Sequence, residues 1–286
     1  MVYFIGVAAA LALGLGYVLQ QRVAATMPLE ELLTWRLLLD LMHRRLWWTG
    51  IGCMVVGQVL AGLALQRATV AVVEPLLSAN LLFALAFAAM FSRHRIRWQE
   101  VVGALLLSAA LAVFSAVGNP HSSPAPDTSG VAITVAVAAV VGAVLLIVAA
   151  ARRRDILAES VLLATGAGLL YGLQDAATRA AFVRIEDHGI ATLPVNPWLY
   201  VVVGSATIGI LLSQSAFKAA RLDYSLPPIA AAEPIAGIVL GISLLGDVVS
   251  VSVAGLAVEV ICLVAMIAGA VLIGRSPNLA ASPVRD

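Results

Sequence analysis

The sequence predicts an all-helical integral membrane protein, and its composition and its long apolar stretches carry that prediction. Of the 286 residues, 62% are hydrophobic and only 12% are charged, and the mean hydropathy is +1.01. Soluble domains are nearer half apolar and a quarter charged. A water-soluble fold of about 300 residues leaves roughly a quarter of its unfolded surface exposed, so it could not hide this much apolar side chain. A lipid bilayer supplies the missing apolar solvent.

Nine apolar stretches are long enough to cross a bilayer as helices. Crossing about 30 Å of hydrocarbon takes roughly 20 residues, and a helix satisfies its backbone hydrogen bonds internally. Two other stretches, 28–46 and 180–197, carry several charges and are expected to form interfacial helices or loops. We expect spans over residues 2–21, 47–66, 69–91, 98–118, 129–151, 156–175, 198–217, 224–245 and 252–274.

The basic residues predict the orientation of these spans, because Lys and Arg in short loops stay on the cytoplasmic side. Fourteen of the 17 follow the odd-numbered spans, and three, Arg67, Arg179 and Arg184, lie on the opposite side. We therefore expect a multi-pass plasma-membrane protein with its amino terminus outside and its carboxyl terminus in the cytoplasm. If residues 28–46 formed a tenth span, the amino terminus would move inside, and this alternative stays open.

An internal repeat divides the chain. At an offset of 152 residues, seven positions match without a gap, and the pair 19–20 matches 173–174 with a slip of two. The offset carries the first span onto the sixth, so corresponding helices cross the membrane in opposite directions. The sequence predicts inverted repeats over residues 1–118 and 153–286, joined by a Pro-rich linker and fifth span at 119–152. The matched positions are Gly14 and Gly166, Gly16 and Gly168, Gly57 and Gly209, Ala64 and Ala216, Ala68 and Ala220, Pro75 and Pro227, and Gly103 and Gly255.

Short motifs in both halves resemble the EamA-type drug/metabolite transporter superfamily. In the first half these are residues 64–68, 73–77 and 98–103, and in the second half residues 214–220, 233–234, 244–247 and 254–255. The superfamily commonly has Leu-Gly-Glu where this chain has Leu-Gly-Asp at 245–247. The resemblance covers nearly the whole chain and implies a bundle of two inverted repeats that works as a transporter.

Other features are similar to one branch of that superfamily, the NIPA-type magnesium transporters. They are Trp47-Trp48-Thr49-Gly50, the 19–22 end of the first span, and the count of nine spans. These motifs are short, apolar and rich in glycine, so they specify a fold better than a substrate.

Carboxyl groups inside the spans are the first candidates for function, since an ionisable group at the centre of a bilayer costs roughly 2.5 to 3.5 kcal/mol. Glu233 lies near the middle of its span, while Glu259, Glu74 and the shallower Asp175 are further candidates. No Lys or Arg in the spans can neutralise them, so each binds a proton, water or an external cation. Competition between proton and cation for one carboxyl is what coupled antiport requires. The alternative is a neutral, hydrogen-bonded structural group.

Prolines and uncharged polar groups extend the candidate site. Proline removes a backbone donor and can open a helix toward a cavity, although a simple packing kink is as good an explanation. An amide side chain in a membrane span more often forms a hydrogen bond between helices than binds a transported solute. The candidate helix-opening residues are Pro75, Pro227 and Pro234, and the candidate polar ligands are Gln214, Asn80, Gln174 and Gln58.

Several classes of function are not expected. The formal net charge of +1 gives no electrostatic attraction for nucleic acid, and Cys53 and Cys262 lack partners at metal-ligand spacing. No nucleotide-binding or metalloprotease motif is present, so we expect neither an enzyme nor a cofactor. The metal content and the oligomeric state stay open, a homodimer included.

Three functional hypotheses follow. The first is a secondary transporter that moves a small polar or cationic solute by alternating access. The second is a magnesium or other divalent-cation carrier or channel, which would need several converging oxygen ligands. The third is a lipid-modifying or assembly protein in the membrane, which would need a polar catalytic cluster at one interface.

Overall fold

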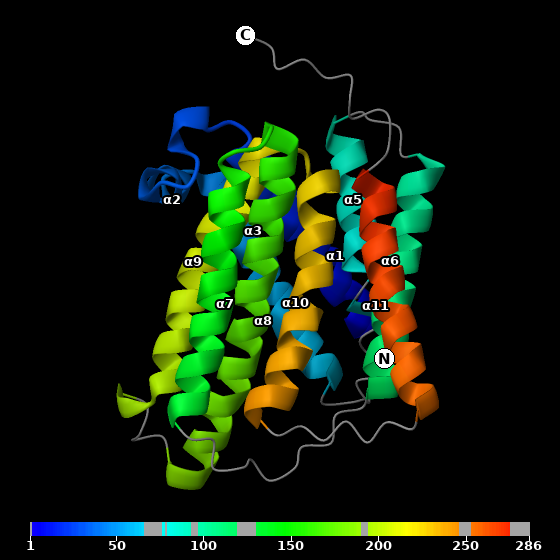
Figure 1. Cartoon of the computed structure of the whole chain (residues 1–286). Helices are drawn as coiled ribbons and strands as arrows, with labels where there is room; N and C mark the ends of the chain where they lie inside the picture. Colours follow the sequence, from blue (N-terminus) through cyan, green and yellow to red (C-terminus); the bar gives the residue numbers. More distant parts are fainter. Residues whose placement is uncertain are drawn as a thin grey trace.

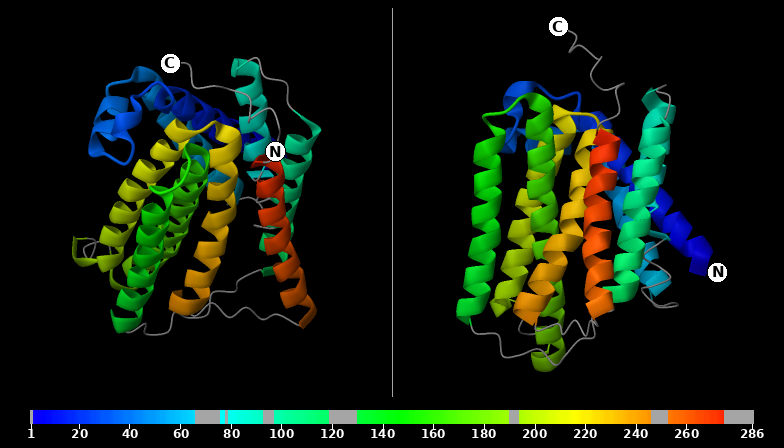
Figure 2. Two further views of the ribbon diagram at one scale, coloured as in Figure 1. Left: turned by 45° about the horizontal axis from the view of Figure 1, so that its top comes forward. Right: turned by 45° about the vertical axis from the view of Figure 1, so that its right-hand side comes forward.

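The computed structural model describes residues 2–65, 76–77, 79–92, 97–118, 130–189, 194–245 and 253–274. Over these residues the chain is helical and contains no strand. Its helices are α1 (Val2–Ala24), a short 3-10 helix η1 (Leu29–Glu31), α2 (Trp35–Met42), α3 (Arg45–Leu65), α5 (Asn80–Ser92), α6 (Trp98–Gly118), α7 (Gly130–Ala151), α8 (Ile156–His188), α9 (Pro197–Ala219), α10 (Leu222–Leu245) and α11 (Val253–Gly274). Most of them run roughly parallel or antiparallel in one bundle, and α1 crosses the others obliquely (Figures 1 and 2).

The prediction of an α-helical membrane protein agrees with these elements. Five helical segments of the described chain are long and apolar enough to cross a membrane: Val2–Ala24, Arg45–Ala64, Thr134–Ala151, Ile156–Thr178 and Pro197–Ala219. Three shorter apolar helical segments, Asn80–Phe91, Trp98–Phe114 and Ala257–Ile273, accompany them. The first part of the predicted span 69–91 lies outside the described residues.

The two charged stretches differ from one another in structure. Residues 28–46 contain only η1 and the eight-residue α2 before α3 begins, and eight helical residues extend about 12 Å, too short for a tenth span. Residues 180–188, by contrast, continue α8 without a break. The helix therefore runs past residue 175, because Ala176, Ala177, Ala180 and Ala181 still pack in the core and no helix-breaking residue precedes Gly189. Its segment that is long and apolar enough to cross a membrane ends at Thr178, within a few residues of the expected end.

Packing within the bundle joins helices in sets. The helix α1 packs against α3 and α5, whereas α8 packs against α7, α9 and α10, and α6 pairs with α11. Figures 1 and 2 show that α1 and α8 run in opposite directions, as do α3 and α9. The largest buried apolar cluster draws residues from both halves of the chain, among them Val18, Leu81, Leu163 and Phe217.

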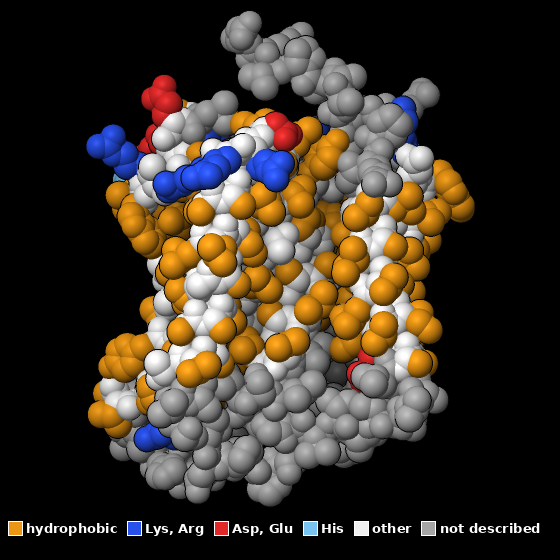
Figure 3. Space-filling view, in the orientation of Figure 1, with side chains coloured by type: hydrophobic (Ala, Val, Ile, Leu, Met, Phe, Trp, Pro, Cys, Tyr) orange, Lys and Arg blue, Asp and Glu red, His pale blue; other side chains and the backbone are white. Residues whose placement is uncertain are grey.

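Arginines gather at one end of the bundle, which we call the basic end. Figure 3 shows most Lys and Arg side chains at the top of the molecule, above a band of hydrophobic side chains. Among the described residues, the exposed Arg184 lies in the last turns of α8, which reach the opposite end of the bundle (Figure 1). The exposed residues that define the basic end are Arg22, Arg36, Arg44, Arg45, Arg152, Arg153 and Arg154.

Candidate functional site

Buried polar side chains collect where α1, α8 and α9 meet, toward the basic end. The last part of α9 supplies most of them, because its residues 211–218 are all buried. Burying a polar group is unfavourable unless it is hydrogen-bonded. Such a concentration inside an apolar bundle therefore marks a candidate site. Its buried members are Gln20, Ser160, Ser213, Gln214, Ser215 and Lys218.

Two glutamines form the centre of this polar region. The Nε2 group of Gln214 donates a hydrogen bond to Oε1 of Gln20 over 2.5 Å, and Nε2 of Gln20 contacts Sδ of Met54 at 2.6 Å. The exposed fractions of Gln20 and Gln214 are 4% and 1%. Within the described chain no donor reaches Oε1 of Gln214. This buried amide oxygen thus keeps unused hydrogen-bonding capacity within the described chain.

Glu233 lies within electrostatic reach of two tyrosines in the bundle. It is half-buried near the midpoint of α10, and its carboxylate is close enough to interact electrostatically with Tyr17 of α1 and Tyr171 of α8. Tyr171 shares a hydrogen bond of 2.9 Å with Ser213, which precedes Gln214. Tyr17 packs edge-on against Phe217, with ring centroids 6.4 Å apart. The carboxylate and the glutamine pair are thereby connected through aromatic side chains.

Glycines on α8 allow α10 to approach this site. A Cβ atom on Gly172 would overlap the carbonyl oxygen of Glu233, and one on Gly168 would lie 2.8 Å from the carbonyl oxygen of Ile229. Small residues four apart let two helix backbones pack closely in a membrane. The spacing of Gly168 and Gly172 therefore sets the position of Glu233 relative to Tyr171.

The structure brings some of the predicted residues together and leaves others apart. Gln174 is half-buried on α8, and Asp175 next to it is exposed but still acts electrostatically on Tyr17. Gln58 is exposed on α3, and Asn80 is half-buried at the first residue of α5. Of the predicted set, Glu233 and Gln214 thus share the polar region most directly.

The remaining predictions concern α10, α11 and residues 74–75. Glu259 is half-buried on α11, next to the cluster that joins α6 and α11 around Cys262. The helix α10 stays continuous through Pro227 and Pro234, although each proline lacks the donor that would bond one turn back. Glu74 and Pro75 lie outside the described residues.

Among the described residues, no group of three His, Cys, Asp or Glu side chains is placed to hold a metal ion. Hard divalent cations bind through six or more oxygen atoms. The described polar region instead offers amides, hydroxyls and the Lys218 ammonium group, with the Glu233 carboxylate within electrostatic reach of Tyr17 and Tyr171.

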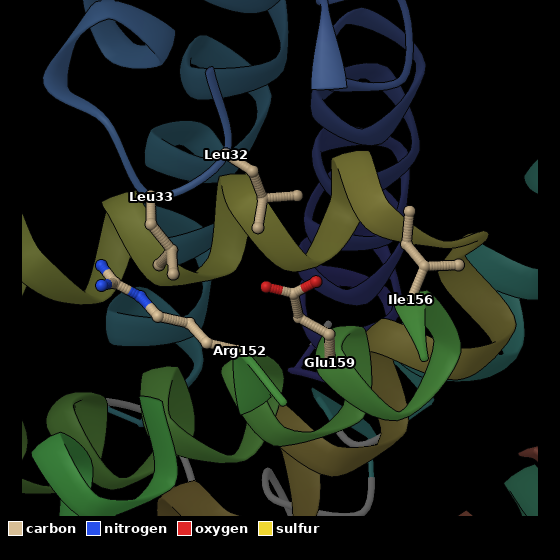
Figure 4. A pocket seen from close by; sticks show the side chains of 5 residues that line it. All are labelled: Leu32, Leu33, Arg152, Ile156 and Glu159. Atoms are coloured by element: carbon tan, nitrogen blue, oxygen red, sulfur yellow. The ribbon is translucent and has the colours of Figure 1, made fainter. Parts of the chain in front are cut away.

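A separate open cavity of about 350 Å³ lies at the basic end (Figure 4). Leu32, Leu33 and Ile156 form its apolar walls, and Arg152 and Glu159 point into it. None of the predicted site residues lines it. The cavity is therefore distinct from the polar region around Gln214.

Sequence reasoning missed Tyr17, Tyr171, Gln20 and Lys218. A signal for three of them was present, since an offset of 154 superposes Tyr17 on Tyr171 and Gln20 on Gln174. This is the slip of two residues noted above. Lys218 was assigned to a cytoplasmic loop, whereas it lies buried in the last turn of α9.

Comparisons with known proteins place the chain beside a bacterial relative. The chain is 29% identical over 242 residues to a protein of Corynebacterium glutamicum that is described as uncharacterized, an overlap covering 84% of this chain and 83% of the relative. No family model matches the chain. No solved structure matches it.

Proposed function

We propose that the protein is a secondary transporter that moves a small polar or cationic solute across the membrane by alternating access. The observation that carries the proposal is the position of Glu233, near the midpoint of α10 and within electrostatic reach of Tyr17 and Tyr171. A carboxyl group at membrane depth is costly to bury, so it marks a candidate site for a proton, an ion or a solute.

The chemistry of the region suits a cation. The Glu233 carboxylate supplies negative charge, and Tyr17 and Tyr171 within its electrostatic reach supply aromatic rings, which attract cations. The free amide oxygen of Gln214 adds a hydrogen-bond acceptor. When a proton occupies Glu233 the attraction for the cation is lost, so proton binding on one side of the membrane drives release of the cation. Competition for Glu233 thereby couples the movement of protons in one direction to the movement of the cation in the other.

Helix packing supports inverted repeats as the scaffold. The contacts of α1 with α3 and α5 correspond to those of α8 with α9 and α10, and each corresponding pair runs in opposite directions. At the interface of α6 and α11, Ala110 and Cys262 belong to one cluster and are separated by the offset of 152. Two inverted halves around a central site are the architecture that alternating access uses.

A flux assay in proteoliposomes tests the proposal. We expect tetraethylammonium to move down an imposed pH gradient, with Mg²⁺ moved far more slowly. Replacing Glu233 with glutamine keeps the size and polarity of the side chain and removes its charge. We expect Glu233→Gln to lower this flux by about tenfold or more. Glu159→Gln, at the basic end, and Glu259→Gln, on α11, serve as matched controls and should retain it.

Two results would contradict the proposal. Proton-coupled flux that is unchanged in Glu233→Gln would remove the role of this carboxylate. Rapid Mg²⁺ movement that depends on Glu259 rather than Glu233 would favour the divalent-cation carrier instead.

A further inference from the structure

The segment between α1 and α3, which we call the strap (residues 25–44), packs across the end of α9. Leu37 and Leu41 of α2 are fully buried, in the same apolar cluster as Phe217 and Leu212 of α9. The α2 helix also contacts α9 directly. The strap therefore covers the basic end of the polar region rather than lying free in solvent.

Polar contacts fasten the strap to α9. The Nζ group of Lys218 donates a hydrogen bond to the carbonyl oxygen of Met27, and the backbone N–H of Leu33 donates one to Oγ of Ser215 over 3.2 Å. Lys218 also attracts the Glu31 carboxylate. Both α9 residues are at least nine-tenths buried. Contacts of this kind in an apolar setting favour one defined position of the strap.

The end of α1 adds to the same fastening. Besides the bond between Gln20 and Gln214, Nε2 of Gln21 donates to the carbonyl oxygen of Phe217 at 3.5 Å. The contacts of Gln20 and Gln21 with α9, together with the bonds from Lys218 to Met27 and from Leu33 to Ser215, are called the latch. All of them join the first half of the chain to one and a half turns of α9.

Backbone conformation shows that the strap is held in place by these contacts. Leu33 has a φ of 59°, in the left-handed region that a leucine rarely adopts. A non-glycine residue in this region is strained and persists where the surrounding structure imposes the conformation. Leu33 is also the residue whose backbone N–H donates to Ser215, so the strained residue itself takes part in the latch.

The two ends of the bundle differ in whether contacts between the two halves of the chain close them. In the inverted repeat, α8 is the counterpart of α1, and α3 is the counterpart of α9. The contact that would correspond to α1 with α9 is therefore α8 with α3. Within the described residues, no contact between α8 and α3 is comparable to that between α1 and α9. The latch thus closes the basic end without an equivalent in the described part of the other end.

We propose that the latch is a gate, which seals the polar region from the basic end and must release the strap before a solute can leave there. This inference rests on the proposed transport function, because it assigns the closed end of that path. Release separates Lys218 from Met27 and Ser215 from Leu33, while α1 and α9 move apart at Gln20 and Gln214.

The test measures access to the polar region without any transported solute. Cys53 and Cys262 are first replaced with alanine, and Ser213→Cys, beside Tyr171, supplies one reporter thiol. A membrane-impermeant methanethiosulfonate is then applied from the basic end in vesicles of known orientation. We expect slow labelling with the latch intact and labelling at least about tenfold faster after Lys218→Met together with Ser215→Ala, because both contacts to the strap are gone. Ser205→Ala and Arg221→Met are the matched controls and should stay slow.

A cross-link gives the converse test, on the background without native cysteines. Because Leu33 N and Ser215 Oγ are 3.2 Å apart, the two Cα atoms lie within about 7 Å, close to the range that a disulfide joins. Oxidised Leu33→Cys with Ser215→Cys should stop tetraethylammonium flux, and reduction should restore it. Each single cysteine variant should be unaffected by oxidant.

The outcomes separate this inference from the transport function. Equal labelling from the basic end with and without the latch contacts, or flux that continues through the oxidised cross-link, would overturn the gate. Faster labelling of the unlatched variant combined with no flux in any variant would support the gate and reject the transporter.

Discussion

At the scale of single residues, Gly172 determines how Glu233 meets α8. No side chain fits at this position, because a Cβ atom would overlap the backbone carbonyl of Glu233 and approach Ala236 at 2.6 Å. The obstacle is a helix backbone, which cannot rotate away as the end of a side chain can. A methyl group there must separate α8 from α10.

We therefore expect Gly172→Ala to destabilise the protein by about 1–3 kcal/mol, the usual range for overpacking. Gly204→Ala on α9 is the matched control, since nothing lies within 4 Å of a Cβ atom there. Thermal unfolding of both variants in the same detergent measures the difference. An unfolding temperature of Gly172→Ala equal to that of Gly204→Ala would show that α8 and α10 do not pack as described.

Residue-level reasoning from the sequence predicted two members of this candidate site. Glu233 and Gln214 were predicted because a charged or amide group in an apolar stretch is conspicuous. Tyr17 and Tyr171 were missed, because a tyrosine in a membrane helix is ordinary and its role depends on which helices meet. Lys218 was missed because α9 extends two residues beyond the expected span, which places Lys218 in the buried last turn of the helix.

At the scale of elements, the strap has a titratable group at its centre. Burial raises the pKa of Glu31, the Asp40 carboxylate adds to this effect, and Lys218 and Arg36 oppose it. The folded strap therefore holds a proton on Glu31 more tightly than the unfolded chain does. The protonated Glu31 side chain contributes its full stabilisation of the fold at a pH below the ordinary glutamate pKa. This contribution is lost as the pH rises through the raised pKa of Glu31.

The prediction for the strap is a pH dependence that one substitution removes. The unfolding temperature should fall as the pH rises above the ordinary glutamate value, and Glu31→Gln should show a smaller fall because its amide does not titrate. Glu30→Gln, one residue away and exposed, should behave like the parent protein. Identical pH profiles for the Glu31→Gln and parent proteins would contradict the assignment.

The elements themselves were mostly predictable from apolar length. Spans 98–118 and 252–274 agree with α6 and α11 to within a residue, since polar residues and glycine bound them. The end of α8 was not predictable from charge, because Arg184 projects into solvent while the same helix keeps alanines on its packed face. The strap was expected to be interfacial, but its packing on α9 follows from tertiary contacts that no local pattern encodes.

At the scale of the whole molecule, the arginines indicate which end faces the cytoplasm. Positive residues are retained on that side during insertion. If the basic end is cytoplasmic, Arg153→Cys should react with an impermeant maleimide in inside-out vesicles, and Arg184→Cys in intact cells or right-side-out vesicles. Both positions are exposed, so neither result depends on local unfolding. Labelling of both from the same side would contradict the predicted topology.

The length of α8 has a practical consequence for imaging this small membrane protein. Its 33 residues extend about 50 Å, against a hydrocarbon layer of about 30 Å, so its final turns stand clear of the lipid even with considerable tilt. Figure 1 shows this helix projecting below its neighbours. A helical fusion partner joined in register near His188 would therefore form a stiff fiducial for particle alignment in electron cryo-microscopy.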